Sequence, residues 1–189
     1  MKLLFVDCCI SQRGKESRTL ALAKAYIDAF RAAHPDWVVE RADPMDLPPL
    51  TAEFLDDRDT RKGEFSAPMF AAARQFQSAD SIVVAAPYWD LSYPAQLKTY
   101  IEHISVNGLC YHYTEQGCQG DCKAEKLVYL TSGGDFEGED SVGVLHWKQL
   151  CRMFGIGTFS YVFAGGLDID PAKTPELLAQ ACEKARSLV

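Results

Sequence analysis

The first segment whose residue types could do chemistry runs from Cys9 to Thr19, directly after a short apolar stretch. It is rich in hydroxyl and cationic side chains, and an amphipathic helix is expected to begin near its end. The N–H groups of a helix N-terminus attract anions, and hydroxyl donors suit a phosphate monoester. We therefore expect a phosphate site, with the alternative that Ser17 only caps the helix. The candidate phosphate ligands are Ser11, Arg13, Ser17, Arg18 and Thr19.

A second segment of this kind, Pro87 to Leu91, carries two aromatic side chains. It follows an apolar, β-branched run at 82–86, which is typical of a buried strand in a parallel sheet. A planar redox cofactor needs a flat surface and N–H donors for its ring. The alternative is that the aromatic residues only pack in the core. The residues expected to hold a ring are Pro87, Tyr88, Trp89, Asp90 and Leu91.

The third segment is Thr131-Ser132-Gly133-Gly134, which follows an apolar run at 126–130. Paired glycines allow the backbone to approach a ligand closely. A plain turn is the alternative interpretation. We expect Thr131, Ser132, Gly133 and Gly134 to contribute to the same cofactor site.

The elements that would position these segments alternate along the chain. Strands are expected at 2–7, 37–41, 82–86, 126–130 and 158–163, and helices between and after them. Ser92 and Thr174 are expected to cap two of the helices. The alternation predicts an α/β fold with a doubly wound, five-stranded parallel sheet of order 2-1-3-4-5, in three layers and one domain over 1–189. In that order the three segments meet at the topological switch point, where open sheets bind ligands.

Composition and charge make several classes of protein unexpected. The net charge of −7 over 189 residues makes a nucleic-acid partner unexpected. No apolar run approaches the roughly 18 residues of a membrane span, and Asp7 ends the apolar start too early for a signal peptide. Seven cysteines, an odd number, favour free thiols in a reducing compartment, and hence a cytoplasmic protein. Cys8, Cys9, Cys151 and Cys182 lie in apolar segments and are expected in the core.

Three other phosphate-binding motifs are excluded by the residues present. There is no G-x-x-x-x-G-K-[ST] motif of a P-loop and no G-x-G-x-x-G motif of a dinucleotide site. A phosphatase loop of the Cys-x5-Arg type would require arginine six positions after Cys8 or Cys9, where Gly14 and Lys15 stand.

Five segments, taken together and in order, resemble the flavodoxin-like NAD(P)H:quinone oxidoreductase and FMN-dependent azoreductase family. The resemblance covers nearly the whole chain. The family's Ala-Pro-Met-Tyr-Asn-Phe loop is similar to Ala86-Pro87-Tyr88-Trp89-Asp90-Leu91. The other four similar segments are Gln96-Leu97-Lys98-Thr99-Tyr100, Tyr111-His112-Tyr113-Thr114-Glu115-Gln116-Gly117, Thr131-Ser132-Gly133-Gly134 and Phe154-Gly155-Ile156.

The resemblance implies a flavodoxin-like FMN enzyme that takes hydride from NAD(P)H and passes two electrons to a quinone, an azo compound or a similar planar acceptor. It also implies a homodimer built on the ring loop and its helix, and Tyr113 or His112 as candidates to line the acceptor pocket. Asp90 and Leu91 depart from the family's Asn and Phe, and a carboxylate near the ring would disfavour an anionic reduced flavin. A non-catalytic electron carrier or a cysteine-based redox sensor is the alternative function.

A cysteine group between 107 and 123 is absent from the family pattern. Cys110, Cys118 and Cys122, with His112, form only a partial metal-ligand pattern, so free thiols are expected and no metal.

Overall fold

The computed structural model describes residues 1–10, 17–136, 138 and 140–189. Its main sheet has five parallel strands in the order β2-β1-β3-β6-β7, which confirms the predicted order when the sheet strands are counted along the chain. The strands are β1 (Lys2–Asp7), β2 (Val38–Ala42), β3 (Ser81–Ala85), β6 (Lys126–Ser132) and β7 (Thr158–Ala164).

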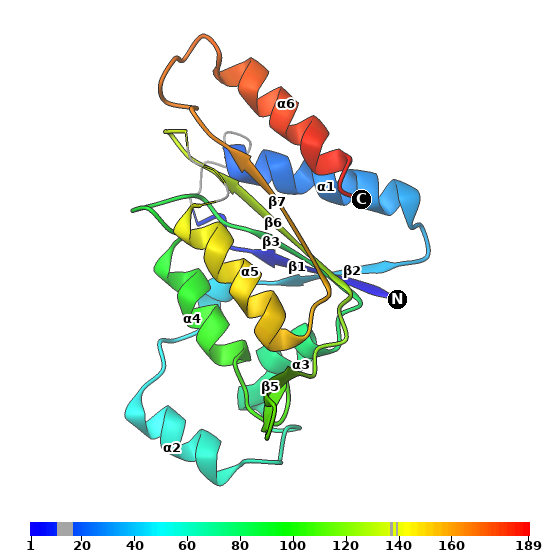
Figure 1. The fold of residues 1–189 in the computed structure, drawn as a ribbon, viewed down its shortest axis with the longest axis vertical. Helices are drawn as coiled ribbons and strands as arrows, with labels where there is room; N and C mark the ends of the chain where they lie inside the picture. Colours follow the sequence, from blue (N-terminus) through cyan, green and yellow to red (C-terminus); the bar gives the residue numbers. More distant parts are fainter. Residues whose placement is uncertain (11–16, 137, 139) are drawn as a thin grey trace.

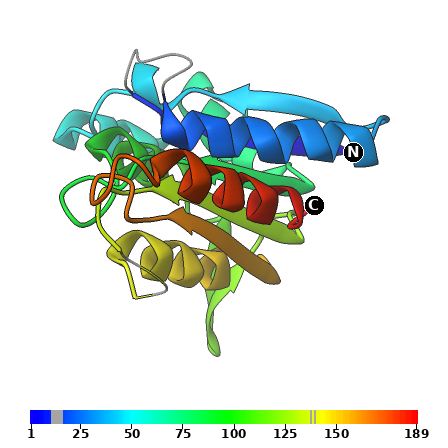
Figure 2. The same cartoon turned by 90° about the horizontal axis from the view of Figure 1, so that it is seen from above.

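Helices cover both faces of this sheet, as Figure 1 shows. On one face α1 (Arg18–Ala33) and α6 (Thr174–Arg186) lie side by side, which Figure 2 shows from above. On the other face lie α3 (Ala71–Gln77), α4 (Ala95–Ile104) and α5 (Val142–Phe154). Every residue of β3 is buried between the two helical layers. A strand that is covered on both faces has apolar side chains on both, which explains the continuous apolar run after Ser81.

The strand register brings four turns to one edge of the sheet. The last residue of β1, Asp7, pairs with the last residue of β3, Ala85, and Ala85 in turn pairs with Leu130 of β6. At the end of β6, Ser132 pairs with Ala164, the last residue of β7. The segments that follow these strands therefore leave the sheet close together, as the switch-point prediction requires.

Three stretches outside the main sheet have structure of their own. The stretch 43–66 contains a 3₁₀ turn at Pro44–Asp46 and a helix α2 (Ala52–Thr60) that buries no residue. A 3₁₀ turn, Pro68–Phe70, leads into α3. The stretch 107–123 forms an antiparallel hairpin of β4 (Tyr111–Thr114) and β5 (Gly117–Gly120).

Two predicted helix caps are wrong. Ser92 does not cap α4, because Pro94 occupies the cap position and Ser92 is paired with Trp89 by two backbone hydrogen bonds. Thr174 is already inside α6, and its hydroxyl donates to the carbonyl of Leu167 at 2.8 Å. In the described part of the chain, no helix is both long enough and apolar enough to cross a bilayer.

Candidate functional site

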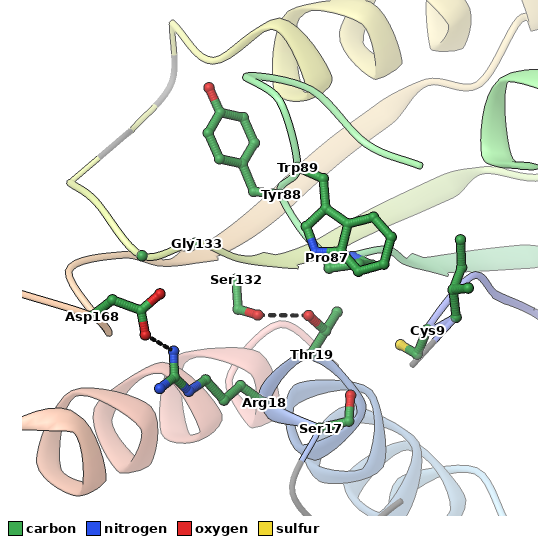
Figure 3. Close-up of a pocket in the computed structure, with 12 residues that line it drawn as sticks. Cys9, Ser17, Arg18, Thr19, Pro87, Tyr88, Trp89, Ser132, Gly133 and Asp168 are labelled. Atoms are coloured by element: carbon green, nitrogen blue, oxygen red, sulfur yellow. Dashed lines mark hydrogen bonds and ion pairs between the residues drawn. The ribbon is translucent and has the colours of Figure 1, made fainter. Parts of the chain in front are cut away.

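A cavity opens where the four turns meet, with about 750 Å³ of free space when its mouth is included. Figure 3 shows its side chains, which come from the start of α1 and from turns far apart in sequence. The described residues that line it are Cys9, Ile10, Ser17, Arg18, Thr19, Pro87, Tyr88, Trp89, Ser132, Gly133, Gly134 and Asp168.

One wall of the cavity is the N-terminus of α1. Ser17 caps this helix, as predicted, and its hydroxyl accepts from the N–H of Leu20 at 3.3 Å. The N–H groups of Arg18 and Thr19 belong to the first turn, where the helix itself offers no acceptor. Capping and anion binding are therefore compatible here, because the Ser17 cap occupies only the N–H of Leu20 and leaves the N–H groups of Arg18 and Thr19 for an anion. Ser11 and Arg13 lie outside the described residues.

The floor of the cavity joins the first and third predicted segments. The hydroxyl oxygens of Thr19 and Ser132 are 2.6 Å apart, and both side chains are buried. One hydroxyl must donate to the other, and the acceptor keeps its own O–H free to donate elsewhere. The pair thus ties α1 to the end of β6 and can still present a hydrogen-bond donor.

The opposite wall is aromatic. The side chain of Trp89 is 44% exposed and lies at the cavity, whereas the Tyr88 ring packs edge-on against Phe163 at 5.2 Å. The N–H of Tyr88 donates to the carbonyl of Ser132 at 2.9 Å, which fixes the second segment against the third. The core-packing interpretation therefore fits the Tyr88 ring, and the ligand-facing interpretation fits Trp89.

A tight turn follows Trp89. Asp90 and Leu91 have φ values of +50° and +64°, a left-handed conformation that costs a leucine roughly 1–2 kcal/mol. Reciprocal backbone hydrogen bonds between Trp89 and Ser92 close the turn, which points Leu91 into solvent. Asp90 and Leu91 do not line the cavity in this chain.

The two glycines of the third segment have different neighbours. A β-carbon on Gly133 would lie 3.2 Å from the Tyr88 ring and 3.0 Å from the Phe163 ring. A β-carbon on Gly134 would lie only 2.5 Å from Oδ2 of Asp168. Gly134 thus makes room for a side chain of the protein, in addition to any ligand.

Three residues that line the cavity are not among the predicted ligands. Cys9 and Ile10 lie directly after β1, and Asp168 lies in the turn after β7, so only their positions after the carboxyl ends of strands could have indicated them. Burial, and next the charge of Asp7, raise the pKa of the Cys9 thiol, which disfavours its nucleophilic thiolate. Cys9 therefore contributes shape to the cavity.

Other predicted residues lie elsewhere. Thr131 is fully buried, because successive residues of β6 point to opposite faces and Ser132 takes the cavity side. Tyr113 and His112 are on β4, whose hairpin packs at the far end of α5, where Gly120 contacts Phe154 and Gly155. They do not reach the cavity of their own chain.

The cysteine group of the hairpin does not converge on one point. Cys110 is buried, Cys118 is exposed, and Cys122 donates weakly to the carbonyl of Cys110 at 3.6 Å. The ring of His112 is hydrogen-bonded to Asp121 at 2.8 Å. Among the residues that the structure describes, no three His, Cys, Asp or Glu side chains gather as a metal site would require.

Comparisons with known proteins agree with this architecture. An FMN-dependent NADH:quinone oxidoreductase of Clostridium beijerinckii is 31% identical over 191 residues, covering 98% of this chain and 96% of that protein. An FMN-dependent NADH:quinone oxidoreductase 5 of Pseudomonas fluorescens is 33% identical over 182 residues, covering 88% and 87%. The crystal structure of an azoreductase from Bacillus anthracis superposes with a TM-score of 0.86 at 24% identity, covering 100% of this chain and 98% of that one, which supports the fold.

The model of the Flavodoxin_2 family, described as having a flavodoxin-like fold, matches residues 1–189. With the full-length relatives, this match shows that the chain belongs to the Flavodoxin_2 family.

Proposed function

We propose that the protein is an FMN-dependent oxidoreductase that takes hydride from NADH or NADPH and passes two electrons to a quinone, an azo compound or a similar planar acceptor. One observation carries the proposal: a single cavity has a helix N-terminus on one wall and an exposed tryptophan on the other. FMN has an anionic phosphate at one end and a planar ring system at the other. The names of the full-length relatives, which specify FMN and NADH, support the same cofactors.

The residues present fit FMN. The first turn of α1 offers N–H donors together with the hydroxyls of Ser17 and Thr19, which suit the phosphate. Gly133 allows the third segment to pack closely against the Tyr88 and Phe163 rings, and this segment and Trp89 would hold the ring. When bound, FMN supplies the hydride-accepting chemistry, and the protein supplies position and electrostatics.

The chain's own groups then have separate tasks. Ser17 and Thr19 hold the phosphate end, and the Thr19–Ser132 contact keeps the two segments at a fixed spacing. Pro87 and Trp89 would form the wall beside a bound ring, and the N–H of Tyr88 fixes this wall to the third segment. Hydride transfer to the cofactor and electron transfer to the acceptor would require no side-chain acid or base.

We also propose a homodimer. Apolar side chains are exposed at the start of α4 and α5, among them Leu91 at 67% and Val142 at 55%. An exposed apolar surface of this kind commonly marks an interface. Tyr113 and His112 would line an acceptor pocket only if a partner chain brought its hairpin there. Sedimentation equilibrium should give twice the chain mass, and a Leu91→Asp variant should lower that mass.

The seven cysteines are all free, which supports a reducing, cytoplasmic setting.

The activity is tested with purified protein by following nicotinamide absorbance with and without menadione, a planar quinone. Oxidation of NADH that depends on both FMN and menadione supports the enzyme. Flavin binding without nicotinamide oxidation would favour the electron carrier, and a response only to mild oxidant would favour the sensor.

The site is tested with Ser17→Ala combined with Thr19→Val, which should weaken FMN binding about tenfold or more, because charge-assisted hydrogen bonds to the phosphate are lost. Thr51→Ala is the matched control, since Thr51 caps α2 away from the cavity. Unchanged FMN retention in the double variant would refute the assignment of these residues.

A further inference from the structure

The side chain of Asp168 enters the cavity from a turn that is fixed by the backbone. The N–H of Asp168 donates to the carbonyl of Gly134 at 3.1 Å, and the N–H of Leu167 donates to that of Gly133 at 3.3 Å. Leu167 is buried, and its own carbonyl accepts from the Thr174 hydroxyl. The carboxylate therefore projects from a rigid support, which is the requirement for orienting another group.

The space for this carboxylate is made by Gly134. A β-carbon at that position would lie 2.5 Å from Oδ2 and 3.2 Å from Cγ of Asp168. Any other residue at 134 would displace the carboxylate from its place. The position of Asp168 thus depends on a neighbouring residue that has no side chain.

The partner of Asp168 is Arg18, the first residue of α1. One guanidinium nitrogen, Nη1, lies 2.6 Å from Oδ1 of Asp168, as Figure 3 shows. Within the described residues this is the one recorded polar contact of the Arg18 side chain. A guanidinium has five N–H donors in a rigid fork, so a contact through one nitrogen leaves donors free.

The pair is partly exposed, with side-chain exposures of 35% for Arg18 and 67% for Asp168. Such pairs contribute little to stability, so a structural role is a weak explanation for it. An arginine beside a helix N-terminus adds charge where an anion would bind, but a free arginine side chain loses much rotamer entropy on binding. A partner that holds the fork in advance removes part of that cost.

We propose that Asp168 is a positioning residue that holds the Arg18 guanidinium at the cavity, so that Arg18 selects a phosphorylated flavin over the same flavin without its phosphate. The proposal rests on the function proposed above and adds the means of phosphate selection. Asp168 acts through Arg18 and touches the cofactor phosphate with no donor of its own. Arg18 donates to the phosphate with the N–H groups that Asp168 leaves free.

The test measures the dissociation constants of FMN and riboflavin by flavin fluorescence, for the full-length apo-protein and its variants. Asp168→Asn should weaken FMN binding by about three- to tenfold, part of the value of a charge-assisted hydrogen bond, while riboflavin binding changes less than about twofold. In an Arg18→Gln background, Asp168→Asn should have no further effect on FMN. Asp57→Asn is the matched control, because Asp57 forms an exposed ion pair with Arg61 on α2.

Three results would overturn the proposal. Tighter FMN binding in Asp168→Asn would mean that the carboxylate repels the phosphate. Equal losses for FMN and riboflavin would mean a merely structural role, and an effect that persists without Arg18 would mean that Asp168 acts alone. If the unaltered protein binds neither flavin, the proposed function fails and the inference fails with it, whereas FMN binding with unchanged selectivity in Asp168→Asn overturns the inference only.

Discussion

Replacing Thr19 by valine tests whether the turns are joined as the structure shows. Valine keeps the shape of threonine but removes the hydroxyl that lies 2.6 Å from Ser132. The Ser132 hydroxyl then loses this partner, although it still faces the open cavity. A net intramolecular hydrogen bond contributes about 0.5–1.5 kcal/mol, so we expect the free energy of unfolding to fall by about 1 kcal/mol. For a chain of this length the melting temperature should fall by about 2–4 °C.

The informative comparison is the double-mutant cycle. Ser132→Ala should cost a similar amount, but Thr19→Val combined with Ser132→Ala should cost clearly less than the sum, with a coupling of about 1 kcal/mol, since no hydroxyl is left unpaired. The assay is urea unfolding of the apo-protein, because bound cofactor would add its own stabilisation. Thr60→Val, on the exposed helix α2, is the control and should change stability by less than about 0.5 kcal/mol. Strict additivity of Thr19→Val and Ser132→Ala would refute the contact.

Three further predictions concern residues that do not line the cavity. Burial, and next the charge of Lys98, lower the pKa of His146 below its ordinary 6.5. As the pH falls below about 6.5, the His146 ring therefore takes up a proton more readily in the unfolded chain than in the folded one, and the melting temperature should fall. The fall should be less steep in His146→Phe. Leu91→Gly should raise the free energy of unfolding in urea by about 1 kcal/mol, because glycine adopts φ = +64° without strain. Gly120→Ala should lower the free energy of unfolding by about 3 kcal/mol, since the new β-carbon would lie 1.9 Å from the backbone nitrogen of Gly155.

Each of these has a contrary outcome. Equal pH slopes for His146→Phe and the unaltered protein would show that this ring does not control the acid sensitivity. A destabilised Leu91→Gly would mean that the leucine side chain contributes more than its backbone strain costs. Gly157→Ala is the control for Gly120→Ala, because its β-carbon would meet only ordinary contact at 3.7 Å, and similar effects at both positions would contradict the close approach.

The sheet was predictable because its strands are short apolar runs separated by helices, and this alternation leaves few topologies. Ser17 was also predictable as a cap, since its chemistry and its place before an amphipathic helix agree. Helix α2 was not predictable from periodicity, because it buries no residue and so carries no apolar stripe. Ser92 misled for a local reason: Pro94 and the left-handed turn after Trp89 set the start of α4 instead.

The turns that form the candidate site could be predicted from the sequence, but not every side chain that faces the cavity. Strand order fixes which turns meet, but the alternation along β6 decides that Ser132 and not Thr131 faces the cavity. Asp168 could not be found from its own surroundings in the sequence, because its partner Arg18 is 150 positions away. The contact that requires glycine at 134 could not be predicted for the same reason, since the atom nearest a β-carbon there would belong to Asp168.

The central claim is that the turns after β1, β3 and β6 form one site for a phosphorylated planar cofactor. Amide hydrogen exchange of the apo-protein, measured before and after one equivalent of FMN, tests it most directly. We predict slower exchange in all three turns together, namely in the first turn of α1, the stretch 87–89 and the stretch 132–134, whereas exchange in helix α2, away from the cavity, should not change. Protection confined to a single turn, or absent from all three at saturating FMN, would contradict it.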